Sequence, residues 1–137
     1  MRRPQSGQAM VELALSLVVI LPFVFSFLAV GQIAIEYVAV RSAATQAAFA
    51  AARAPSATTA QQSARQAAQE AVAGSQVRNF QITVDTQGFQ RGAVLTATAT
   101  GCVSLDLFPL TPAIFGRCPR LAWSAHALIE PYRSRQP

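Results

Sequence analysis

The sequence contains no lysine and only one histidine, His126, and charged side chains make up 12% of its 137 residues. The few acidic residues are dispersed, and neither a glycine-rich phosphate loop nor a Gly-x-Ser-x-Gly motif is present. Because acid–base and nucleophilic catalysis need several such groups in one place, the composition argues against an enzyme. Two cysteines and one distant histidine do not make a metal ligand set either. We therefore predict no metal and no cofactor.

The positive charge is too weak to indicate a nucleic-acid partner. The formal net charge is +5, and it comes from arginines that are scattered along the chain. Nucleic-acid binding usually needs a basic patch or stripe, which this sequence does not contain.

One long apolar run dominates the chain. The 23 residues from Leu13 to Ile35 include no charged side chain, and a helix of that length, roughly 34 Å, can cross a hydrocarbon core of about 30 Å. Arg2 and Arg3 precede the run and no acid occurs before Glu12, so the positive-inside rule keeps the N-terminus in the cytoplasm. We expect a single-pass protein with one small exported domain. Pro22 either kinks the helix or is tolerated, and we favour tolerance.

The start of the chain resembles a known processing signal. A short basic leader ends at Gly7, the five residues Gln8-Ala9-Met10-Val11-Glu12 follow, and the apolar run then begins. With the proline inside that run and the segment Tyr37 to Ala48 behind it, the chain resembles the TadE-like pseudopilins of the tight-adherence (Tad/Flp) pilus, which belong to the type IV pilin-like superfamily. The resemblance covers roughly residues 1–53 well and the remainder only in outline.

The resemblance implies a pilus-assembly subunit in a bacterial inner membrane. A prepilin peptidase would cleave after Gly7 and leave Gln8 as the new N-terminus. Glu12 would match the acid that family members use in assembly with other pilin-like subunits and the inner-membrane platform. The exported domain would be periplasmic or extracellular, or incorporated in a pilus. Major Flp pilins are much shorter and carry Glu-Tyr where this chain has Glu12-Leu13, which favours a minor pilin or pseudopilin.

Elementary physics also gives Glu12 a role. Its carboxylate would lie about 6 Å along the helix axis from the new amine, is favoured by the helix dipole, and can pair with the amine of an axially displaced neighbour. Such a pair sets register more than it adds stability, because both charges must be desolvated. The alternative is a first-turn acid that lies at the level of the lipid headgroups.

Two other interpretations remain open. Ala29-Val30-Gly31 offers the small residues that a general signal peptidase reads, and cleavage before Gln32 would release a secreted binding module. An uncleaved, anchored protein could instead use its exported domain to bind a partner or cell-wall material. The chain stays apolar from Ile33 to Val40, which suits a helix that continues out of the membrane. The first residue of the mature protein distinguishes all three interpretations.

The patterns predict an α+β fold. After a leader at residues 1–7 and a transmembrane helix at 8–35, residues 36–74 read as an amphipathic stalk and a second helix. The break falls at Ala54-Pro55-Ser56, where Ser56 can cap the next helix. Small residues form a stripe along that helix, namely Ala60, Ala64, Ala67 and Ala71. The stripe predicts close helix packing, either within the chain or between neighbouring subunits.

A two-residue period follows Gly74 and predicts a small antiparallel sheet at 75–132, with a tail at 133–137. Cys102 and Cys118 bracket a proline-containing loop before the last strand. In an oxidising compartment they can form a disulfide, which would stabilise the domain by about 3 kcal/mol; two free thiols are the alternative. The loop carries apolar side chains that either plug the sheet or meet a partner, namely Phe108, Leu110, Ile114 and Phe115.

Overall fold

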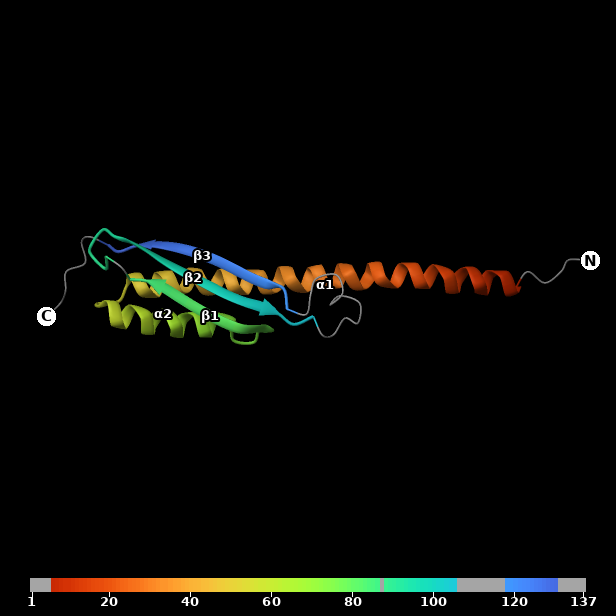
Figure 1. Ribbon diagram of the computed structural model, residues 1–137, viewed down its shortest axis with the longest axis horizontal. Coiled ribbons are helices and arrows are strands. Elements are labelled where there is room, and N and C mark those ends of the chain that lie inside the picture. Colours follow the sequence, from red (N-terminus) through yellow and green to blue (C-terminus); the bar gives the residue numbers. More distant parts are fainter. Residues whose placement is uncertain (1–5, 87, 106–117, 131–137) are drawn as a thin grey trace, which may run out of the picture.

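The computed structural model describes residues 6–86, 88–105 and 118–130. Two helices, α1 (Ser6–Ala52) and α2 (Ala57–Val72), precede three strands, β1 (Val77–Asp85), β2 (Val94–Val103) and β3 (Arg120–Leu128). Figure 1 shows α1 as a long rod whose N-terminal half projects beyond the rest of the molecule. A long apolar helix, a second helix and an antiparallel sheet confirm the predicted α+β class.

Helix α2 begins at a capping box and folds back along α1. The Ser56 side chain accepts a hydrogen bond from the Thr59 backbone N–H at 3.3 Å, and the Ser56 N–H donates to Thr59 Oγ1 at 3.1 Å. The backbone N–H groups of Ser56 and Thr59 are therefore both satisfied. The buried face of α2 consists of Ala60, Ala64 and Ala68, and it packs on an alanine face of α1 that comprises Ala43, Ala44, Ala47, Ala48 and Ala51. Of the predicted stripe, Ala60 and Ala64 are thus buried within the chain, whereas Ala67 and Ala71 are half-buried.

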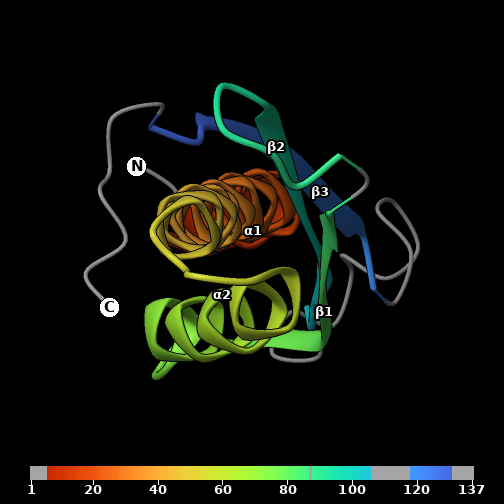
Figure 2. The same ribbon diagram turned by 90° about the vertical axis from the view of Figure 1, so that its left-hand side faces the viewer.

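The sheet has the order β1-β2-β3 with both pairs antiparallel. Its inner face covers the two helices with small and medium side chains such as Leu95, Ala97 and Ala99, all buried. Its outer face carries the alternating threonines of β2, and these hydrogen-bond to β3: Thr98 Oγ1 lies 2.9 Å from Ser124 Oγ. Figure 2 shows this arrangement end-on, with the sheet curving along one side of α1 and α2.

Strand β1 contains an irregularity close to its start. Arg78 pairs with Cys102 and Gln81 with Thr100, so β1 carries one more residue than β2 between these pairs. Asn79 lies in that interval with φ 52°, a left-handed conformation that asparagine tolerates better than most residues. Gly101 lies opposite the bulge, where a Cβ atom would collide with the Val77 side chain.

Three segments meet at one end of the sheet, which we call the proximal end. β1 begins there at Val77, β2 ends at Val103 and β3 begins at Arg120. Figure 1 shows that this end faces the projecting half of α1. The predicted disulfide, Cys102–Cys118, is present at this end and links β2 to the residues just before β3. The apolar loop residues named above, and the predicted tail, lie outside the described residues.

Candidate functional site

The projecting half of α1 is uncovered by the rest of the protein. We call residues 7–28 the bare segment; apart from the half-buried Phe25, its large apolar side chains are exposed, for example Met10 at 77%, Phe23 at 73% and Phe27 at 79%. The first fully buried side chain of α1 is Ala29. From that point α1 contacts α2 and all three strands.

Within the described part of the chain, α1 is the one helix long and apolar enough to cross a membrane. A core helix of a soluble protein would pass the same test, but its apolar side chains would be buried, whereas here they are exposed. The bare segment therefore has the properties of a membrane anchor or of a signal sequence. Soluble monomers rarely expose a continuous apolar surface of this size.

The residues predicted for processing and assembly lie together at the start of α1. The helix begins at Ser6, so the Gly7–Gln8 bond falls in its first turn. Glu12 is exposed one turn further on, and the Gln8 side-chain amide donates to Glu12 Oε1 at 3.4 Å. The two side chains thus share one face of the helix. Arg2 and Arg3, predicted to set the membrane orientation, lie outside the described residues.

Pro22 lies inside α1 without ending it. The Ser26 hydroxyl donates to the Pro22 carbonyl at 2.8 Å, and Ser16 does the same to the Glu12 carbonyl. Such side-chain bonds to the preceding turn are common in apolar helices. The helix therefore continues through the proline, in agreement with the expected tolerance.

A second acidic residue of α1 was not singled out by its sequence context. Glu36 is only 3% exposed, and its Oε1 accepts from the Gln32 side chain and from the Gln76 backbone N–H, each at 3.1 Å. Glu36 Oε2 and Ser75 Oγ are buried without a hydrogen-bond partner among the described residues. The Glu36 carboxylate thus holds the segment between α2 and β1 against α1. The available signal was its position, one helical turn after Gln32 and just beyond the uncharged run.

Glu12 and Glu36, the two acidic residues of α1, lie far apart along the helix. Glu12 and Glu36 are 24 residues apart, which is roughly 36 Å along a helix. The disulfide Cys102–Cys118 lies at the proximal end, on the side of Glu36. The structure therefore brings Gly7, Gln8 and Glu12 together and places the cysteines elsewhere.

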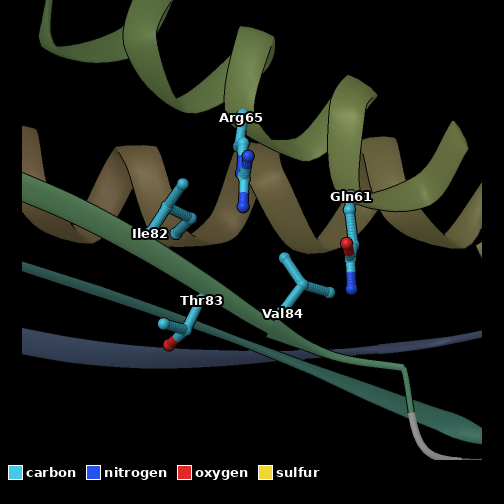
Figure 3. A pocket seen from close by; sticks show the side chains of 5 residues that line it. All are labelled: Gln61, Arg65, Ile82, Thr83 and Val84. Carbon is cyan, nitrogen blue, oxygen red and sulfur yellow. The ribbon is translucent and has the colours of Figure 1, made fainter. Parts of the chain in front are cut away.

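A shallow depression lies between α2 and β1. Figure 3 shows its lining, which comprises Gln61, Arg65, Ile82, Thr83 and Val84. Its volume, about 180 Å³, is below the range of roughly 300–1,000 Å³ that is typical of small-molecule sites. We assign it no ligand.

His126 lies on the outer face of the sheet. Its Nδ1 is 2.9 Å from Thr96 Oγ1, an ordinary cross-strand contact. Among residues 6–86, 88–105 and 118–130, no three His, Cys, Asp or Glu side chains gather closely enough to hold a metal ion. The geometry therefore directs attention to α1 rather than to the sheet.

Comparison of the chain with protein-family models, with curated proteins and with solved structures finds no match.

Proposed function

We propose that this chain is a membrane-anchored, pilin-like structural subunit, a minor pilin or pseudopilin that contributes to a Tad/Flp-type pilus or secretion apparatus. A prepilin peptidase removes the leader after Gly7, the bare segment stays in the membrane, and the folded domain lies outside. The observation that carries the proposal is the double role of α1. One continuous helix is at once the exposed apolar rod and the spine of the domain.

The charge distribution along the rod supports an assembly role for Glu12. It is the one charged side chain between Gly7 and Ile35, and it is exposed on the same face as Gln8. A carboxylate there can pair with the free amine of a neighbouring subunit inside a low-dielectric environment. The partners of the protein in this proposal are the peptidase, other pilin-like subunits, the assembly platform and lipid.

The packing of α1 favours a retained anchor over a signal sequence. Removal of a signal sequence before Gln32 would cut α1 inside the part that the domain already covers, since Ala29 is fully buried and Ile33 packs against the core. A signal sequence is normally separate from the mature fold. Here the cut would take a buried side chain from the core.

Mass spectrometry of the protein purified from membranes tests the proposal. A mature chain that begins at Gln8 is expected. An intact leader would favour an uncleaved anchored protein, and a chain that begins at Gln32 would favour a secreted binding module. A Gly7→Leu variant, which blocks a peptidase that reads glycine, should keep the leader while it still enters the membrane fraction.

A further inference from the structure

We propose that the proximal end of the sheet rests on the anionic surface of the same bilayer that holds α1, with Arg78 and Arg120 in contact with lipid phosphates. The inference deepens the proposed function and rests on membrane anchoring by α1. It concerns the orientation of the exported domain, which the anchor alone leaves open.

The strand register brings the two arginines onto one face. Arg78 of β1 and Arg120 of β3 both pair with Cys102 of β2, so all three side chains lie in one row across the sheet. Both arginines are exposed. Two strand spacings separate them, roughly 10 Å, which is close enough for both to meet one patch of lipid headgroups.

Contacts with α1 give the position of this row along the axis of α1, and hence its distance from the membrane. On β3, Trp123 meets Tyr37 and Arg41, and Arg120 precedes Trp123 by three residues, roughly 10 Å toward the proximal end. Ten ångströms correspond to about seven residues of helix, which places Arg120 near the level of Ile33. On β1, the Gln76 N–H bonds to the Glu36 carboxylate. Arg78, two residues later, is therefore roughly 7 Å further from the membrane than Glu36.

The bilayer ends at the same height. A hydrocarbon core of about 30 Å that begins at Leu13 spans about 20 residues of helix and ends close to Ile33. The backbone of Arg120 therefore lies close to the hydrocarbon edge, and that of Arg78 lies roughly 10 Å further out, a distance that a long arginine side chain largely spans. Arginine is well suited to this position, because its planar fork of donors matches phosphate.

The surface of α1 points to the same placement. The domain covers one side of the helix from Ala29 onward, while the open side stays apolar, with Ile35 66% and Val38 63% exposed. The apolar part of the bare segment, Leu13 to Leu28, measures only roughly 24 Å, which is less than the hydrocarbon thickness. Burying the apolar helix fully therefore draws the domain down onto the membrane.

Headgroup quenching of Trp123, the single tryptophan of the chain, tests the contact. The full chain is placed in nanodiscs of phosphatidylcholine, with or without 30% phosphatidylglycerol, that carry a nitroxide on some choline headgroups. Each arginine near an anionic surface is worth about 1 kcal/mol, or roughly fivefold. We expect stronger quenching with phosphatidylglycerol. In Arg78→Gln/Arg120→Gln, the ratio of molecules whose domain contacts the bilayer to molecules whose domain does not should fall roughly 30-fold. High salt should reduce the extra quenching that phosphatidylglycerol causes in the wild type.

Two matched variants serve as controls. Arg53→Gln/Arg91→Gln removes the same charge at the other end of the domain and should quench like the wild type. Arg78→Lys/Arg120→Lys keeps the charge and should retain most of the anionic-lipid effect. Circular dichroism and an intact disulfide show that each variant is folded.

Quenching that is equal in both lipid mixtures, or unchanged in Arg78→Gln/Arg120→Gln, would overturn the proposed contact. Failure of the anchor is a separate result. It shows before lipid is varied, as a mature chain that begins at Gln32 or as a protein that does not enter the nanodisc.

Discussion

Trp123 of β3 packs edge-on against Tyr37 of α1, with ring centroids 5.7 Å apart and ring planes at 88°. Arg41, one turn further along α1, places its guanidinium carbon 5.1 Å from the centre of the Trp123 ring. Trp123 thus links β3 to α1, beside Leu121 and Ala127 of the same strand, which are buried in the core. Trp123 is partly buried and packs against a core built largely of alanine, where a large aromatic ring adds much contact area.

Replacement of the ring should therefore weaken the domain. We expect Trp123→Ala to lower the free energy of unfolding by about 3 kcal/mol, measured by denaturant unfolding of the full chain in detergent micelles. Arg41→Gln, which removes only the cation–π contact, should cost about 0.5–1 kcal/mol. Equal effects of the two substitutions would contradict the assigned contribution of the ring.

The buried carboxylate of Glu36 predicts a second effect. Glu36→Ala leaves the Gln76 N–H and the Gln32 amide without their acceptor and should cost about 1–3 kcal/mol. Glu36→Gln keeps an oxygen at that place and should remain closer to the wild type. Hydrogen exchange at the Gln76 amide provides the measurement: protection should be lost in the alanine variant and kept in the glutamine variant. Unchanged protection in both would show that the bond is unimportant.

Gly101 offers a test of packing at the bulge. A side chain there meets Val77, whose β-branched side chain has little freedom to move away. Gly101→Val should therefore cost about 1–3 kcal/mol through overpacking. Thr100→Val, on the neighbouring position of the outer face, should change stability by less than about 0.5 kcal/mol. Thermal unfolding of both variants compares them, and a neutral Gly101→Val would mean that the β1 bulge adjusts freely.

Under the proposed function, Glu12→Ala should still enter the membrane and still lose its leader, but should not enter assemblies. The Glu12 side chain is exposed, so its loss should leave the fold intact and remove only the pairing with a neighbouring subunit. Co-purification with other pilin-like subunits is the measurement, and Glu70→Ala, an exposed acid on α2, is the control. Wild-type co-purification of Glu12→Ala would remove the assembly role.

Local signals in the sequence predicted much of this fold. Pro55 and Ser56 marked the start of α2 because their backbone preferences act within a few residues, and the two-residue period marked the three strands. Details that depend on distant partners were missed. The buried stripe of α2 includes Ala68 where the sequence suggested Ala67, because the direction of approach of α1 selects the face. The bulge at Asn79 in β1 was not foreseen either, because it depends on the pairing with β2.

The two acids of α1 show the same limit for the candidate site. Glu12 was found because a local pattern, the distance from Gly7 to the apolar run, singled it out. Glu36 follows no such local pattern, yet it is buried. Its partner, Gln76, is 40 residues away in sequence. No periodicity within α1 contains that information.

Each helix or strand after α1 packs on an element that precedes it in the chain. α2 packs on α1, β1 joins these helices, β2 pairs with β1, and β3 pairs with β2 while it closes on α1. Every newly synthesised segment after α1 thus meets an element that is already made. A chain that emerges N-terminus first can build this architecture stepwise during its synthesis, with the arrival of Trp123 as the closing event.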